Sequence, residues 1–441
     1  MQFIGREEEI AWLREERKRS RENARFTVVT GRRRVGKTEL IRHAYNDGAG
    51  RYLYLLLNRQ SERMLCAAVA KSIREQIGGA LPIVGTVDHL IDLLRAVFAL
   101  GVSEPITVVI DEFQEMDYVN STFFAELQGL WDEIHTTHKI NLVVSGSVNR
   151  MMNKIFFDYA SPLYGRSTGH LNLRPFSPSL MKRIYTEHAP KFSAAALLDL
   201  WAITGGIAKY VALLMDAKAY TREKMLAEVV SMGSTFLEEG RAILMQEFGN
   251  EFGTYFSILS AIACGHTRFA EIVKDLGIEL GSYLSNLENN YKLIRKVLPI
   301  YSSAKAKNAM YQIDDMFFRF WFRYIFKNQS QLALGHYELL RKEIAADFDV
   351  FNGFALECYF YWKLATECDY RNLGAWWDRK NENEIDLVAE AKGRLDFFEV
   401  KRDVGKIDLK VLERKAVAFF EKNPDRQSLK TSFRGLSLAD M

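Results

Sequence analysis

A short segment near the start of the chain restricts its fold more than any other. Residues 25–31, RFTVVTG, form a β-rich run that ends in glycine, and ELIRHAY (39–45) has the pattern of a helix. Between them, GRRRVGKT (31–38) matches the spacing Gly-x4-Gly-Lys-Ser/Thr. A strand, a glycine-rich turn and a helix in this order predict a loop that binds the phosphates of a nucleotide.

Each residue of this loop has a physical role. Gly31 and Gly36 let the backbone curl so that its N–H groups face a phosphate, and the helix N-terminus adds partial positive charge. Lys37 can reach the β- and γ-phosphates of ATP, and the Thr38 hydroxyl can bind Mg²⁺. The other predicted nucleotide-binding positions are Arg32, Arg33, Arg34, Val35 and Glu39. The three arginines could contact phosphate, or they could be solvated.

Two acidic residues end a later strand-like run. ITVVIDEF (106–113) has the composition of a buried strand and places Asp111 and Glu112 at its end. Asp111 could hold Mg²⁺ through water, and Glu112 could orient or deprotonate the attacking water. Together with the phosphate loop, this pair predicts nucleotide hydrolysis.

The first third of the chain alternates strand-like and helical segments. RYLYLLLN (51–58) and INLVVSGS (140–147) are two further strand-like runs, and residues 60–78 and 86–100 are amphipathic. This alternation predicts an α/β fold with a mostly parallel sheet covered by helices.

Composition limits the class of protein. The chain has 441 residues, which suggests two to four domains, and 48% hydrophobic with 26% charged residues is typical of a globular protein. A net charge of +3 permits nucleic-acid contact without arguing for it, and the four scattered cysteines favour neither a disulfide framework nor a zinc site. No apolar run approaches the length of a membrane span, and MQFIGREEEI lacks the core of a signal peptide, so we expect a cytoplasmic protein without membrane contact.

Six motifs then carry a family resemblance. FIGREEEIAWL (3–13), VVTGRRRVGKTEL, ITVVIDEFQEM, LVVSGSVNRMM, PLYGRSTGHLNLRPFS and ITGGIAKYV occur in this order. The set resembles the archaeal-type ATPase family, a branch of the STAND and AAA-like P-loop ATPases, over about residues 1–250. The resemblance implies that Phe3, Gly5 and Arg6 lie near the adenine and that Ser145 or Ser147 senses the γ-phosphate.

Two positions of these motifs leave alternatives open. The resemblance makes Arg166 a candidate to act on phosphate charge, in the same molecule or from a neighbour, and the alternative is a surface salt bridge. Ala208 stands where the family often has proline, which leaves open whether this turn closes on the nucleotide.

The middle of the chain has the pattern of a winged helix. Short helical segments over about 251–292 precede two strand-like runs, LIRKVLPIYS and AMYQIDD. The third helix would be the recognition helix for DNA, but it carries Glu288, Asn289 and Asn290 and few basic residues. A contact with a partner or another domain is therefore at least as well supported as DNA reading.

The last hundred residues contain a second acidic cluster. AWWDR, EIDLVAE and FFEVKR read as three consecutive strands, so Glu399 and Lys401 share a face and Asp386 can lie beside them. Glu357, on a helix upstream, could face the same sheet. Such carboxylates could hold Mg²⁺, and the lysine could stabilise a scissile phosphate or position water; the alternative is a cross-strand ion pair.

This arrangement resembles the PD-(D/E)xK nuclease superfamily, and residues 337–420 resemble the uncharacterised domain often fused behind archaeal-type ATPases. The resemblance implies catalytic roles for Asp386, Glu399 and Lys401, with metal bound by Glu357, Asp386 and Glu399. We therefore predict four parts: an ATPase core (1–177), a helical lid (178–250), a winged-helix-like domain (251–318), and a connecting helix with a mixed α/β restriction-endonuclease-like domain (319–441).

The sequence leaves three functions open. In the favoured hypothesis, ATP and Mg²⁺ drive a switch whose C-terminal domain binds or cuts DNA or RNA. In the second, the switch signals or scaffolds, and the C-terminal domain binds a protein partner or a second copy without cutting. In the third, the middle segment makes the protein a DNA-binding regulator with ATP as effector.

Overall fold

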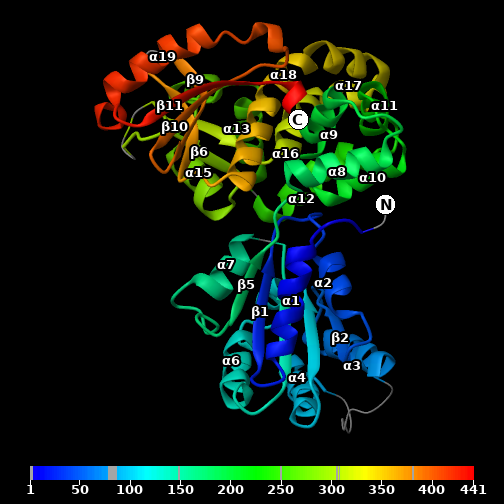
Figure 1. The fold of residues 1–441 in the computed structure, drawn as a ribbon. Coiled ribbons are helices and arrows are strands. Elements are labelled where there is room, and N and C mark those ends of the chain that lie inside the picture. Colours follow the sequence, from blue (N-terminus) through cyan, green and yellow to red (C-terminus); the bar gives the residue numbers. More distant parts are fainter. Residues whose placement is uncertain are drawn as a thin grey trace. The chain divides into compact units, whose positions relative to one another are not determined.

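A computed structural model describes residues 3–77, 87–147, 149–248, 251–303, 306, 308–379 and 382–441. The chain divides into two compact units, with the boundary between Arg174 and Pro175 (Figure 1). Of the helices in these ranges, none combines the length and the apolar character that a membrane crossing requires. Residues 78 and 86 of the predicted amphipathic segments lie outside the described residues.

The N-terminal unit contains a five-stranded sheet in the order β2-β3-β4-β1-β5, and every pairing is parallel. The predicted parallel α/β fold is confirmed. Because all strands run the same way, the carboxyl ends of β1, β3 and β4 meet at one edge of the sheet. The strands are β1 Arg25–Thr30, β2 Arg51–Leu56, β3 Ile106–Asp111, β4 Ile140–Ser145 and β5 Gly169–Asn172.

Helices cover both faces of this sheet, so the central strands β3 and β4 are buried along their whole length. Successive residues of β3 show the alternation, since Val108 packs into one core and Val109 into the other. The longer helices of this unit are α1 Glu7–Arg19, α2 Lys37–Tyr45, α3 Glu62–Ile77, α4 Leu90–Ala99, α6 Phe123–Ile134 and α7 Asn149–Phe157.

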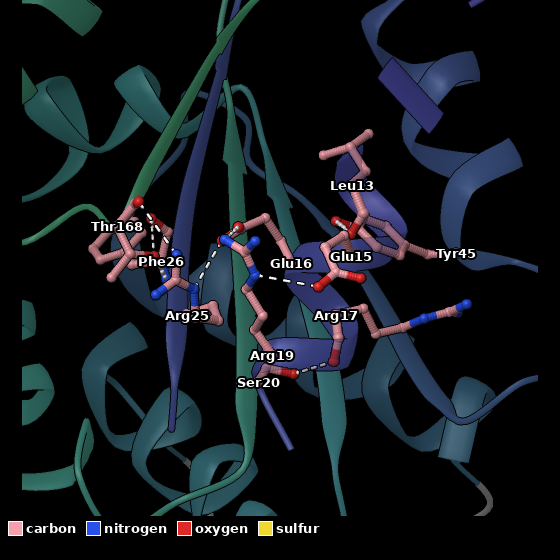
Figure 2. Close-up of polar contacts among 10 residues, drawn as sticks. All are labelled: Leu13, Glu15, Glu16, Arg17, Arg19, Ser20, Arg25, Phe26, Tyr45 and Thr168. Carbon is pink, nitrogen blue, oxygen red and sulfur yellow. Dashed lines mark hydrogen bonds and ion pairs between the residues drawn. The ribbon is translucent and has the colours of Figure 1, made fainter. Parts of the chain in front are cut away.

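Polar contacts fix α1 against β1 and α2 (Figure 2). The buried carboxylate of Glu16 accepts a hydrogen bond from Arg25 Nε of β1 at 2.8 Å, and the Tyr45 hydroxyl donates to the Leu13 carbonyl at 3.0 Å. A buried carboxylate is stable only when it is paired, so this ion pair holds the helix in a defined position on the sheet.

The C-terminal unit begins with five helices: α8 Pro178–His188, α9 Ala194–Thr204, α10 Ala208–Asp216, α11 Arg222–Val229 and α12 Thr235–Phe248. Ala208 is the first residue of α10 and follows Gly205 and Gly206, whose φ angles are 58° and 73°. Proline is favoured at a first helical position because its N–H is not needed there. Although Ala208 stands where the family often has proline, α10 still begins at this residue and the turn before it is formed.

Three helices and an antiparallel strand pair follow. They are α13 Phe252–Ala263, α14 Phe269–Leu276, α15 Gly281–Ser285, β6 Ile294–Val297 and β7 Met310–Ile313. The order of helices and strands in this segment is the one predicted from the sequence.

The remainder combines helices with a four-stranded sheet in the order β11-β10-β9-β8. The strands β8 to β10 are antiparallel neighbours, whereas β11 returns parallel to β10 after the helix α19. The mixed α/β character predicted for this region is confirmed. Its elements are α16 Met316–Phe320, α17 Gln329–Ala333, α18 Tyr337–Glu367, β8 Asn372–Trp377, β9 Glu384–Ala391, β10 Arg394–Val400, α19 Leu409–Lys422 and β11 Lys430–Leu436.

Candidate functional site

The loop 31–38 lies at the carboxyl edge of the parallel sheet, where it joins β1 to the first turn of α2. Gly31 has a φ of 145°, and a Cβ there would come within 2.5 Å of the Leu173 carbonyl oxygen. Gly36 has a φ of 99° and precedes the first residue of α2. Both conformations favour glycine, so the predicted curl of the backbone is formed.

Lys37 turns its side chain back over this loop. Its Nζ donates to the carbonyl oxygens of Gly31 at 2.8 Å and Arg32 at 3.1 Å, and the residue is 8% exposed. Burial lowers the pKa of this ammonium group to about 8, although the negative charges of Glu112 and Asp111 oppose the shift. The loop therefore holds an ammonium group whose charged form would be stabilised by an anionic phosphate.

Asp111 is the centre of a hydrogen-bond cluster at the end of β3. Its carboxylate accepts from Thr38 Oγ1 at 2.9 Å, from Ser145 Oγ at 2.5 Å, from the Glu112 amide at 3.0 Å and from the Tyr54 hydroxyl. Burial and the Asp111 charge raise the pKa of Tyr54, so its hydroxyl stays a donor. Hydroxyl and carboxylate oxygens are ligands that Mg²⁺ prefers, so Thr38 and Asp111 fit the metal that accompanies ATP.

Glu112 lies beside this cluster with a φ of 53°, in the left-handed region. Its Oε2 accepts from Gln114 Nε2 at 2.5 Å and from Ser147 Oγ at 3.2 Å, and Ser147 accepts from Arg33 Nε at 3.3 Å. The two candidate serines are thus separated, since Ser145 contacts Asp111 and Ser147 joins Glu112 to the loop. Left-handed backbone at a non-glycine residue is costly, and such residues are often found at functional sites.

The other predicted nucleotide contacts have different surroundings. Val35 is buried in the core and offers the loop only its backbone, and Glu39 pairs with Arg42 on the surface of α2 at 3.5 Å. Phe3 stacks on His43 in the last turn of α2 with 3.9 Å between ring centroids.

Gly5 and Arg6 form the turn before α1. Their φ angles are 78° and 69°, and the Arg6 guanidinium bonds Glu9 at 3.0 Å and the Arg174 carbonyl at 2.6 Å. The adenine role of Phe3, Gly5 and Arg6 stays a prediction.

Arg166 forms a surface salt bridge. Its guanidinium donates to both carboxylate oxygens of Asp132 in α6, at 3.1 and 3.4 Å, and to the Tyr164 carbonyl at 3.1 Å. It precedes β5, which runs parallel to β1, so it lies toward the amino edge of the sheet while the loop 31–38 lies at the carboxyl edge. The structure does not bring Arg166 to the phosphate loop of its own chain, and a role toward a neighbour's nucleotide stays a prediction.

The C-terminal unit brings Asp386, Glu399 and Lys401 together. Lys401 Nζ lies 3.1 Å from Asp386 Oδ2 and 2.8 Å from Glu399 Oε1, and Asp386 Oδ2 also accepts from the Val400 amide at 2.7 Å. Lys415 of α19 reaches the other oxygen of Glu399 at 3.2 Å. The sequence reading missed Lys415, because only the crossover through α19 brings it to this cluster.

Several carboxyl groups at and around this cluster have raised pKa values. Burial, and then the charges of Asp386 and Glu384, raise the pKa of Glu357 to about 8. Burial likewise raises the pKa of Asp386, and burial and Asp386 raise that of Glu384. Glu384 was also missed, although it is two residues from Asp386 on the same strand and so shares its face.

Within the described ranges, no three or more His, Cys, Asp and Glu side chains surround one point as metal ligands would. The pair Asp386 and Glu399 is present, but each carboxylate is turned toward a lysine. These oxygen donors fit Mg²⁺ chemically, and binding it would require Lys401 to move. A site of three carboxylates, with Glu357 as the third, stays a prediction.

Comparisons with known proteins agree with this geometry. Residues 3–214 match a family described as an ATPase domain predominantly from Archaea, and residues 321–413 match archaeal and bacterial proteins of unknown function. An uncharacterised protein of Methanocaldococcus jannaschii, MJECL04, is 29% identical over 426 residues, which cover 92% of this chain and 90% of the relative.

Two solved structures are similar to this chain, and the first of them shares its fold. The Walker-type ATPase PABY2304 of Pyrococcus abyssi aligns with a TM-score of 0.54 at 20% identity, over 73% of this chain and 96% of that one. The ORC2 protein of Aeropyrum pernix, in ADPNP and ADP complexes, aligns with a TM-score of 0.49 at 13% identity, over 78% and 96%.

Residues 3–214 are similar to this predominantly archaeal family of ATPase domains, and we refer to them below as the ATPase domain. The match implies that the ATPase domain binds a nucleotide, and residues 31–38 stay the predicted site. The C-terminal match, over residues 321–413, carries no known function.

Nucleotide binding to the ATPase domain is expected to take up about one proton near pH 9 and almost none near pH 7. Near pH 9 the Lys37 amine, with a pKa of about 8, is mostly neutral before binding, whereas the triphosphate is already fully ionised. The phosphates would raise the pKa of Lys37, so a proton binds together with the nucleotide. Calorimetric titration in two buffers of different ionisation enthalpy measures the uptake, and no uptake near pH 9 would contradict this account.

Proposed function

We propose that the chain is an ATP- and Mg²⁺-dependent switch whose ATPase domain controls a nuclease-like C-terminal domain that binds and cuts nucleic acid. The proposed cutting of nucleic acid rests on the position of Lys401 Nζ between the carboxylates of Asp386 and Glu399. A lysine beside two acidic residues at the end of a strand provides the charges that phosphodiester hydrolysis requires.

In the ATPase domain, Lys37 would neutralise charge on the β- and γ-phosphates, and Thr38 and Asp111 would hold Mg²⁺. Glu112 would orient the attacking water and accept its proton. Ser147, which bonds both Glu112 and Arg33, is placed to couple the occupancy of the loop to the position of this base.

In the C-terminal domain, Asp386 and Glu399 would hold Mg²⁺, which would supply positive charge for the scissile phosphate. Lys401 is more exposed than the two carboxylates, at 36% of its side chain against 10% and 9%. It could therefore move from the carboxylates to a phosphate oxygen, while Lys415 keeps Glu399 oriented.

An ion-pair network supports a link between the helices that follow the ATPase core and this cluster. Asp349 of α18 pairs with Arg222 of α11 at 2.8 Å and with Arg402, the neighbour of Lys401, at 2.6 Å. Arg222 also makes a two-point contact with the buried Asp199 of α9, at 3.0 and 3.1 Å. A shift of α9 and α11 would therefore reach the residue next to Lys401.

Replacing Asp349 by alanine is expected to remove the effect of ATP on the C-terminal domain while leaving ATP turnover within about twofold of the wild type. The reason is that Asp349 joins Arg222 to Arg402 and belongs to neither proposed catalytic site. The measurement compares nucleic-acid cleavage or binding with and without ATP in both proteins.

Asp347→Ala is the matched control, since Asp347 lies on the same helix but pairs with Arg323 and Tyr324. An unchanged ATP effect in Asp349→Ala would reject the network as the link.

The second candidate function is a switch whose C-terminal domain binds a partner without cutting. It is favoured by the pairing of both Asp386 and Glu399 with lysines, which is the arrangement of a structural ion-pair cluster. In that case the lysines would stay on the carboxylates and no metal would bind.

A DNA-binding regulator acting through the middle segment has less support. The connection after β6 packs on the edge strand β8, where the Ile300 amide donates to the Ala375 carbonyl at 2.8 Å. The Trp377 indole likewise donates to the Asn308 carbonyl at 3.1 Å. In a winged helix, the connection between β6 and β7 would be the wing. Its described residues are occupied by these contacts with the chain's own C-terminal sheet.

The test is an incubation of the full chain with labelled single- and double-stranded DNA and RNA. It is run with Mg²⁺ or Mn²⁺ or a chelator, and with or without ATP. Cleavage that requires the divalent ion and changes with ATP is the expected result. Absence of cleavage in every lane would select the partner-binding switch.

A further inference from the structure

A buried amide lies between two acidic residues just after β3. Gln114 is fully buried (0% exposed), and its Nε2 donates to Glu112 Oε2 at 2.5 Å and to Glu115 Oε1 at 3.5 Å. An amide flanked by two carboxylates must direct its NH₂ group toward them, because its oxygen would be repelled there. The sequence reading assigned no role to this residue.

The surroundings prevent this amide from turning away. A Cβ on Gly146, at the end of β4, would overlap both Gln114 Oε1 and the side chain of Met152. The Oε1 atom has no hydrogen-bond partner among the described residues, so hydrogen bonds hold the amide only through its NH₂ group. Such packing locks the rotamer of a side chain, and a locked neighbour keeps a site in one geometry.

The contacts continue outward to the surface. The other oxygen of Glu115 pairs with Arg59, whose guanidinium lies 3.6 Å from the centre of the Tyr118 ring. The Arg59 side chain is 51% exposed and Tyr118 is 55% exposed. A continuous set of contacts thus leads from an exposed arginine to the carboxylate of Glu112.

We propose that Gln114 is the positioning residue of Glu112 and that Glu115 and Arg59 hold Gln114 from the surface side. The inference rests on the hydrolytic role proposed for Glu112. With Gln114 and Ser147 as two donors, the carboxylate is fixed in direction although its backbone is in the left-handed region. Gln114 is fully buried, so it acts through Glu112 and not on the nucleotide.

The variant Gln114→Met keeps the length of the side chain and removes the donor. It is expected to lower kcat for ATP hydrolysis on the order of 10- to 100-fold, with KM for ATP and ATP affinity unchanged. In a Glu112→Gln background the same substitution should cause no further loss, because two residues that act as a unit are not additive. Arg59→Met, at the surface, should lower kcat by about threefold with KM unchanged.

The control is Asn141→Leu, which removes an equally buried amide at the start of β4, distant from the carboxyl edge. A loss of kcat in Gln114→Met that persists in the Glu112→Gln background, or that Asn141→Leu reproduces, would overturn the inference. If Gln114→Met does not fold, Arg59→Met decides: kcat equal to the wild type, or a loss that persists with Glu112→Gln, overturns it. Full activity of Glu112→Gln itself would instead remove the proposed role of Glu112.

Discussion

Replacing Glu112 by glutamine is expected to lower kcat for ATP hydrolysis by on the order of 10²-fold or more while ATP binding is retained. Glutamine has the same shape, and its amide oxygen can still accept from Ser147 and Gln114, so the local geometry should survive. It cannot take a proton from water, and this is the step that the variant removes. Lys37, Thr38 and Asp111 are untouched, so the phosphates and Mg²⁺ should still bind.

Two measurements separate this outcome from unfolding or lost affinity. Phosphate release gives kcat and KM, and equilibrium binding of ATP gives the affinity of the variant. Glu104→Gln is the matched control, because Glu104 pairs with Arg51 at 3.0 Å just before β3, at the opposite end of that strand from Glu112. If Glu112→Gln keeps wild-type turnover, the proton acceptor is another group and Glu112 is a structural acid.

The arrangement of the residues in the predicted nucleotide site could be anticipated because its parts are local or follow from strand direction. Lys37 and Thr38 are set by the loop itself, and Asp111 meets Thr38 because β1 and β3 both end at the carboxyl edge. Period-two alternation likewise placed Lys401 beside Glu399, and the hairpin between β9 and β10 brought Asp386 to them.

The partners of these residues could not be predicted, because they come from distant segments. Lys415 reaches Glu399 only through the fold of α19 on the sheet, and Tyr54 reaches Asp111 from the neighbouring strand β2. Arg166 shows the opposite case. Its motif suggests phosphate chemistry, but the side chain pairs with Asp132, which is a tertiary contact invisible in the sequence.

Gln114 shows why a motif alone does not assign roles. Its place two residues after Glu112 is visible in ITVVIDEFQEM, yet a glutamine after a strand is equally consistent with a solvated turn. Only the burial of its amide and the contact with Gly146 distinguish a packed hydrogen-bond donor from a surface residue.

Replacing Asp386 by asparagine is expected to abolish metal-dependent cleavage of nucleic acid, a loss on the order of 10²-fold or more. The asparagine oxygen can still accept from the Val400 amide, which donates to Asp386 at 2.7 Å, so the end of β10 should keep its position. The negative charge that would attract Mg²⁺ is removed, and Lys401 keeps only Glu399 as a charged partner. Cleavage of the best substrate found for the wild type is the measurement.

Binding of Mn²⁺, followed by calorimetry, separates the metal from the lysine. Asp386→Asn should lose C-terminal Mn²⁺ binding, whereas Lys401→Met should retain it and lose cleavage, because the lysine would act on the phosphate. For the Mn²⁺ titration both are made in a Lys37→Ala, Thr38→Ala and Asp111→Asn background so that the ATPase site does not contribute, whereas cleavage is measured with that site intact. Glu390→Gln is the matched control on β9, since Glu390 bonds Tyr301 and Asn372 and does not contact Lys401. If neither variant changes metal binding or cleavage, the cluster is an ion-pair network, and the C-terminal domain acts by binding a partner.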